Sequence, residues 1–192
     1  MVGIAGGKAC FKMDRGGPFH VNASPSSPEP WLRGTLTEVS AVPRAVLHAL
    51  ELADEDLRKW CASLSDPELN ARPHGLPSVA FQLRHIARSI DRLLTYAEGK
   101  PLSDEQLGAL REESRPDASV RAVFAELSES FTRAAARIRA LAKSDREQAR
   151  VVGKKALPTT LGGLLVHVAD HTQRHVGQAI TTAKILLAER HR

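Results

Sequence analysis

Three histidines follow one another at intervals of four residues near the C-terminal end of the chain. His167, His171 and His175 would lie on one face of a helix, because four residues make slightly more than one turn. Two imidazoles one turn apart can direct ring nitrogens at one metal ion, whereas the outer two of the three lie about 12 Å apart along the axis. One neighbouring pair is therefore predicted to bind a metal, and the remaining histidine has another role.

A helical-wheel projection selects the pair. The apolar stripe of this segment passes through Val168, and His175 and His171 lie about 20° and 60° from it on the wheel. His167 lies about 100° away. We therefore expect His171 and His175 to face the interior and His167 to lie at the edge.

A further ligand is needed, because imidazole-bound metals usually have three or more protein ligands. His85 is a candidate, since it borders the apolar stripe of an upstream helical segment and has Gln82 and Ser89 at helical spacing. The downstream segment has a matching polar border, formed by His167, His171, Gln178 and Thr182. Alone, His85 would more often be an ordinary packed or surface residue. Together with the downstream pair, it predicts a metal site.

Few other polar side chains are expected to face this interior. Asp54 lies near the edge of an apolar helix face and is the best candidate for a general base, although a surface ion pair is the more ordinary role. Arg88 and Arg92 could bind an anionic group of a substrate, or simply be solvated. Cys61 adjoins Trp60 and is expected to be reduced and packed.

Four amphipathic helices would position these side chains. Each shows apolar residues at helical spacing, and the expected ranges are about 40–65, 78–97, 116–141 and 158–186. A four-helix bundle is the natural packing for such helices. Because no strand-like alternation is present, the predicted class is all-α.

The segments between these helices differ in length. The long connection over 98–115 permits a parallel crossover, and Ser103 to Gln106 has the form of a capping box, which predicts a short helix there. A polar, basic link is expected over 143–155. Residues 1–34 are rich in Gly, Pro and Ser and are predicted to be a flexible N-terminal extension, which leaves 35–192 as one domain.

Composition is that of an ordinary globular protein, with 42% hydrophobic and 26% charged residues among 192. No apolar run is long enough to cross a membrane, and no signal-peptide pattern is present, so the default expectation is a cytoplasmic protein.

The net charge is +5, but basic residues are scattered among acids and aromatics make up only 4%. We therefore expect no nucleic-acid partner. Two distant cysteines predict neither a disulfide framework nor a thiolate zinc site.

Two segments of the chain carry a family resemblance. LPSVAFQLRHIARSIDRLL (76–94), followed by TTLGGLLVHVADHTQRHVGQAI (159–180), is similar to the DinB-like superfamily, which includes YfiT-type metal-dependent hydrolases. The shared features are an Asn/Arg/Pro loop before the second helix, a histidine near the start of that helix, and an HxxxH-x-GQ block in the last helix. Their order and spacing cover about residues 36–188.

The resemblance implies a fold and a metal triad. The fold would be an up-down-down-up bundle with a long crossover between the second and third helices, commonly a homodimer. The triad would be His85, His171 and His175, in agreement with the wheel. Members often have a second histidine just before the last ligand and an arginine after it, whereas this chain has Arg174 and Val176.

Three functions remain open on this basis. Three neutral imidazoles leave open positions on an ion, where water is acidified toward pKa ~7 on zinc or a thiol loses its proton. Several relatives transfer or isomerise conjugates of low-molecular-weight thiols, such as mycothiol or bacillithiol. The chain is thus expected to be a metal-dependent thiol S-transferase with a small-molecule substrate, a metal-dependent hydrolase, or a non-catalytic stress-response protein with a structural ion. Zinc and nickel suit nitrogen ligands, with iron or manganese as alternatives.

Overall fold

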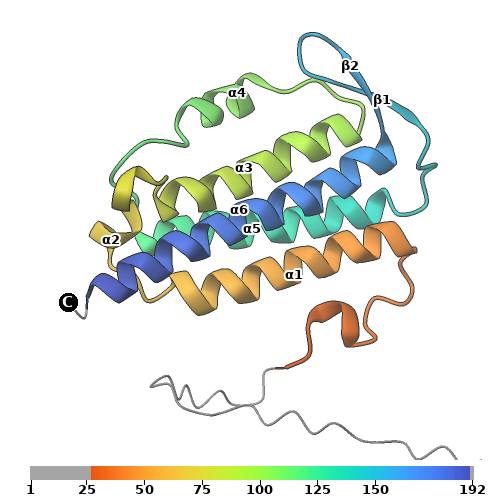
Figure 1. The fold of residues 1–192 in the computed structure, drawn as a ribbon. Coiled ribbons are helices and arrows are strands. Elements are labelled where there is room, and N and C mark those ends of the chain that lie inside the picture. The colour runs from red at the N-terminus through yellow and green to blue at the C-terminus, as the bar shows by residue number, and fades with distance from the viewer. Residues whose placement is uncertain (1–26, 191–192) are drawn as a thin grey trace, which may run out of the picture.

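A computed structural model describes residues 27–190 of the chain. Most of the predicted N-terminal extension therefore lies outside the described residues, as does Cys10. Four long helices dominate (Figure 1). Two short helices, one 3-10 turn and one hairpin join them, and a second 3-10 turn precedes the first of them. The elements are η1 Pro30–Leu32, α1 Ala41–Cys61, α2 Asp66–Asn70, η2 Pro73–Gly75, α3 Val79–Ala97, α4 Asp104–Arg111, α5 Val120–Ala140, β1 Ala149–Val152, β2 Leu157–Thr160 and α6 Leu161–Glu189.

The four long helices form the predicted up-down-down-up bundle. Figure 1 shows α1 and α6 running in one direction and α3 and α5 in the other. The chain returns from the end of α3 to the start of α5 through the connection that contains α4, so the predicted crossover is confirmed. Helix α6 packs along both α1 and α3, and α5 packs mainly along α3. The pairing of α3 with α6 is what positions the histidines.

Apolar residues at helical spacing build the core between these helices. Leu57 of α1, Ile86 of α3, Leu127 of α5 and Leu165 of α6 are all fully buried. Burying one such side chain contributes about 1.5–3 kcal/mol. The periodicity that predicted the helices is thus also the pattern that packs them, because each apolar stripe faces its neighbours.

Capping residues set where the helices begin. The hydroxyl groups of Ser78, Ser119 and Thr160 each accept a hydrogen bond from a backbone N–H in the first turn of α3, α5 and α6 respectively. The predicted capping box of α4, between Ser103 and Gln106, is present. Helix α5 starts at Val120, four residues later than Pro116, because Ser119 caps it there.

The hairpin formed by β1 and β2 replaces part of the expected polar link. The strands pair antiparallel, from Ala149 opposite Thr160 to Val152 opposite Leu157. The sequence predicted a polar, basic link over 143–155, a fourth helix from about residue 158, and no strand. The expectation of no strand was wrong here, and α6 begins at Leu161, after β2. Each strand has only four residues and remains partly exposed, so no hydrophobic alternation long enough to be recognised exists.

The segment before α1 contacts the bundle through Arg33. Arg33, just after η1, donates hydrogen bonds of 2.6 and 2.8 Å to the two carboxylate oxygens of Glu55 on α1. The last residues of the predicted extension therefore contact the bundle.

None of the described helices is both long and apolar enough to cross a membrane.

Candidate metal centre

Helices α3 and α6 bring three histidines together. One ring nitrogen from each of His85, His171 and His175 lies within 4.8 Å of the others. Nε2 of His85 and Nε2 of His171 are 3.0 Å apart, and the ring centroids of His85 and His175 are 4.3 Å apart. All three residues are partly buried. The predicted ligands thus converge from two helices that are distant in sequence.

Local packing explains why these rings point at one another. His85 is next to Ile86, and His171 and His175 are each followed by a buried residue, Thr172 and Val176. The histidines therefore lie at the edges of the two apolar stripes, where α3 and α6 meet. Spacing of one turn on α6 places His171 and His175 on the same side.

Glu113 orients the imidazole of His85. Its Oε2 lies 2.7 Å from Nδ1 of His85, and its Oε1 accepts a hydrogen bond of 2.7 Å from Arg92. Burial raises the pKa of Glu113, but hydrogen bonds and charges from His85 and Arg92 outweigh it, so that the pKa is lowered overall. An ionised carboxylate only accepts hydrogen bonds, so His85 donates through Nδ1 and its Nε2 faces the cluster.

Gln82 orients the imidazole of His175 in the same manner. Its Oε1 lies 2.7 Å from Nδ1 of His175, and its side chain is buried. An amide oxygen accepts hydrogen bonds, so Nδ1 of His175 donates and leaves Nε2 as the nitrogen with the free lone pair. Two of the three imidazoles therefore have their tautomer fixed by a partner outside the cluster, as is usual for histidines that bind metals.

The environment of the cluster favours uncharged imidazoles. Burial lowers the pKa of His171 to about 4, assisted by the neighbouring charges of His175 and His85. Burial likewise lowers the pKa of His175, and the charge of His85 acts in the same direction. Neutral imidazole is the form that binds metals, so His171 and His175 are held in the ligating form at neutral pH.

The separations between the nitrogens fit a single ion. Two imidazole nitrogens bound tetrahedrally to one zinc ion at about 2.0–2.1 Å are about 3.4 Å apart. The observed 3.0 Å between His85 and His171 is close to this value, and all three nitrogens lie within 4.8 Å of one another. The donor set, three imidazoles and no thiolate, suits zinc, nickel, iron or copper. The identity of the ligands remains a prediction.

His167 lies apart from this cluster. It is exposed, and its Nδ1 is 3.6 Å from Oδ2 of Asp170 on the solvent side of α6. Its ring centroid is 5.3 Å from that of His171. The structure therefore places His167 at the edge of the helix face, where the wheel put it.

The other candidates occupy ordinary structural positions. Asp54 accepts hydrogen bonds of 3.0 and 2.8 Å from Arg58, so its carboxylate takes the surface ion pair expected as the ordinary role. Arg88 is paired with Glu126 on α5. Cys61 is fully buried, and burial raises the pKa of its thiol to about 12. The packed, unreactive role expected for Cys61 agrees with this position.

Sequence reasoning missed Glu113 and misjudged Arg92. Glu113 follows α4 in the crossover connection and has no periodic relation to His85, from which it is 28 residues distant. Arg92 is neither solvated nor free to bind a substrate, because it holds Glu113 in place. A carboxylate in a turn gives no signal by spacing, so only the fold could reveal this contact.

These observations define a class, namely an up-down-down-up helical bundle with three histidines that converge between two of its helices. The profile of the DinB superfamily matches residues 49–179, more than half of the chain, and the chain belongs to that superfamily. No curated protein matches the sequence.

One solved structure is similar to the chain. It is YfiT from Bacillus subtilis, described as a probable metal-dependent hydrolase with an unusual four-helix bundle topology. The two share 18% sequence identity, with a TM-score of 0.56 over 75% of this chain and 87% of YfiT. At this identity the similarity establishes the fold alone.

Proposed function

We propose that this protein is a metal-dependent enzyme that acts on a small molecule, with one divalent ion held by His85, His171 and His175. The observation that carries the proposal is the convergence of three ring nitrogens within 4.8 Å. Partners outside the cluster orient two of the rings, Glu113 on His85 and Gln82 on His175. A chance cluster of histidines would not need such partners.

The number of ligands favours catalysis over a structural ion. Among residues 27–190, the cluster that could hold a metal contains three members. Structural zinc sites in proteins have four protein ligands, whereas catalytic sites have three and keep a position open for water or substrate. Bound there, an ion would act as a Lewis acid that lowers the pKa of a coordinated water or thiol. Zinc or nickel is the proposed metal.

The surrounding residues favour a thiol as the substrate that becomes the nucleophile. Hydrolysis usually needs a carboxylate that accepts a proton from water. Both oxygens of Glu113 are already occupied, by His85 and Arg92, and Asp54 is paired with Arg58. A thiol depends less than water on a nearby base, because the pKa of a thiol is already closer to neutrality. We therefore propose transfer of a low-molecular-weight thiol to an electrophilic small molecule.

Hydrolysis is the second candidate. It is favoured by one observation, the fold shared with YfiT, a probable metal-dependent hydrolase. The two candidates differ in whether a thiol is consumed.

A paired assay separates the candidates. Protein purified without a metal-affinity step is reconstituted with zinc or nickel and given bacillithiol or mycothiol together with monobromobimane, or p-nitrophenyl acetate without thiol. We expect metal-dependent formation of the bimane conjugate that is lost in His171→Ala and retained in His167→Ala. Metal-dependent ester hydrolysis without thiol would instead support the hydrolase. Metal binding without either activity would contradict an enzyme of these two types.

A further inference from the structure

A cavity distant from the histidines lies between the end of α3, α4 and the β-hairpin. Its volume is about 680 Å³, within the range of about 300–1,000 Å³ that is typical of small-molecule sites. Tyr96, which lines the cavity, is eleven residues after His85 on α3. The two sites are therefore separated by about 16 Å along the helix axis, so the cavity is not the space around the histidine cluster.

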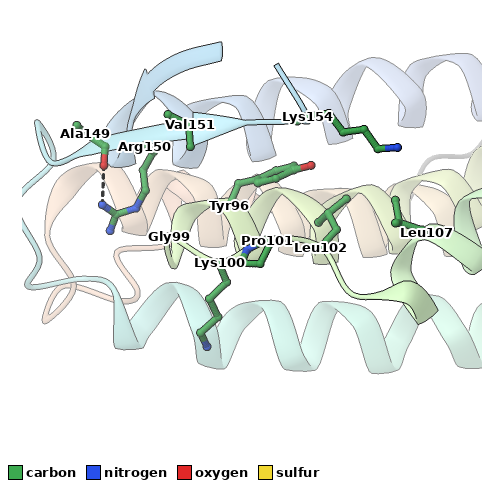
Figure 2. Close-up of a pocket in the computed structure, with 11 residues that line it drawn as sticks. Tyr96, Gly99, Lys100, Pro101, Leu102, Leu107, Ala149, Arg150, Val151 and Lys154 are labelled. Atoms are coloured by element: carbon green, nitrogen blue, oxygen red, sulfur yellow. Dashed lines mark hydrogen bonds between the residues drawn. The ribbon is translucent and has the colours of Figure 1, made fainter. Parts of the chain in front are cut away.

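Much of the cavity lining is apolar. Tyr96 from α3, Pro101 and Leu102 from the crossover connection, Leu107 from α4 and Val151 from β1 line it. Figure 2 shows the Tyr96 ring lying between Lys154 on the hairpin side and Leu102 on the other side. Such a surface suits an aliphatic chain or a flat ring, because apolar contact supplies most of the affinity in small-molecule sites.

The charged residues of the lining are all cations. Lys100, Arg150 and Lys154 line the cavity, and none of its lining residues is acidic. Lys100 is paired with Glu98 and extends away from the Tyr96 ring in Figure 2. Arg150 donates to the carbonyl oxygens of Ala97 and Ala149, so its charge is not neutralised by these partners.

Lys154 is the cation that a ligand can reach. It forms no hydrogen bond or ion pair with residues 27–190, and in Figure 2 its ammonium group points in the same direction as the phenol oxygen of Tyr96. The phenol likewise has no partner within this part of the chain. A phenol donor and a cation therefore both line a largely apolar cavity, and such a lining suits a carboxylate on an apolar body.

Arg150 also fixes the geometry of the cavity. Its Nε is 2.6 Å from the carbonyl oxygen of Ala97, the last residue of α3, and its Nη2 is 2.9 Å from Oε1 of Gln148. A terminal carbonyl of a helix lacks an intrahelical partner, so this bond both satisfies α3 and holds the hairpin over it. The cavity is thus preformed.

We propose that this cavity binds a small amphipathic carboxylate, with the apolar body against Tyr96, Leu102 and Leu107 and the carboxylate at Lys154. The site is separate from the histidine cluster and independent of the activity proposed for it. The lining contains no His, Cys, Ser, Thr, Asp or Glu side chain. The cavity therefore acts as a binding site.

The single tyrosine of the chain reports on this cavity directly. Full-length protein labelled with 3-fluorotyrosine gives one 19F resonance, which is followed during titration with decanoate, decanol or decylammonium. Decanoate is expected to shift the resonance saturably and to bind about tenfold more tightly than decylammonium. Lys154→Glu should lower the affinity for decanoate about tenfold or more. The matched control Lys155→Glu, whose residue is outside the lining, should leave that affinity unchanged.

Filling the cavity gives a second test. Leu107→Trp replaces an aliphatic side chain with a larger indole ring that fills the cavity. Decanoate should then no longer shift the 19F resonance, while metal content stays unchanged. The proposal is overturned if decanoate causes no saturable shift, if decylammonium binds as tightly as decanoate, or if the Lys154 and Lys155 variants bind alike.

Discussion

At the scale of single residues, the site depends on partners that hold the imidazoles rather than on the imidazoles alone. His85 and His175 each donate through Nδ1 to a buried acceptor, Glu113 or Gln82. This fixes which nitrogen faces the cluster. A ring free to rotate would lose more conformational freedom when it binds an ion, and the ion would bind more weakly.

Replacing Glu113 by Gln should weaken metal binding without removing a ligand. The amide keeps the size of the side chain but lacks the negative charge that orients His85, so we expect a loss of affinity of about 10–100-fold. Isothermal titration of zinc into metal-free protein measures it. The control is Glu112→Gln, because Glu112 is exposed and pairs with Arg115. Equal affinities for the two variants would show that Glu113 has no role in positioning His85.

Metal-free protein should lose stability on acidification because of His171. Its pKa, about 4 in the folded state owing to burial and the neighbouring histidine charges, is about 6.5 in an unfolded chain. Between these values the unfolded chain binds the extra proton. The contribution of neutral His171 to the free energy of unfolding is therefore fully present above pH 6.5 and is lost as the pH falls toward 4. We expect Tm to decrease over this window, and to decrease less in His171→Ala. A decrease of the same size in both proteins would be inconsistent with this cause.

At the scale of elements, apolar periodicity predicted the four long helices, each of which buries one face. It did not predict the hairpin, whose strands are partly exposed. The four long helices follow from their apolar stripes, and the start of α4 follows from its capping box. The hairpin escaped prediction because its strands are short and exposed, with Pro158 in β2. It is held by pairing of backbones and by Arg150, neither of which leaves a pattern in the sequence.

The candidate site divides in the same way. His171 and His175 were found through helical spacing, and His85 through its place at the border of an apolar stripe. Glu113 could not be found, because its contact with His85 depends on how the crossover connection folds back across α3. Spacing predicts neighbours within one helix, and only tertiary structure reveals neighbours from a loop.

Cys61 at the end of α1 should resist thiol reagents in the native protein. It is fully buried, and burial raises its pKa to about 12, so almost no reactive thiolate is present at neutral pH. In a Cys10→Ser background it is the only thiol of the chain. Ellman's reagent should label it only after denaturant is added. Rapid labelling of the folded protein would indicate that the end of α1 opens.

At the scale of the whole molecule, the buried core extends from Val39 to Leu186 within the described residues. Deleting residues 1–26 is therefore expected to leave Tm unchanged, as measured by circular dichroism. A decrease of several degrees would mean that this segment stabilises the bundle. The homodimer implied by the family resemblance stays a prediction, and light scattering on the same two proteins would test it.

The central claim is that His85, His171 and His175 bind one divalent ion between α3 and α6. It is tested most directly by metal content per chain, from elemental analysis of protein purified without a metal-affinity step. We predict about one ion per wild-type chain, near-zero content in the Ala variants of these three residues, and near wild-type content in His167→Ala. Near wild-type content in His85→Ala, together with loss in His167→Ala, would contradict the account.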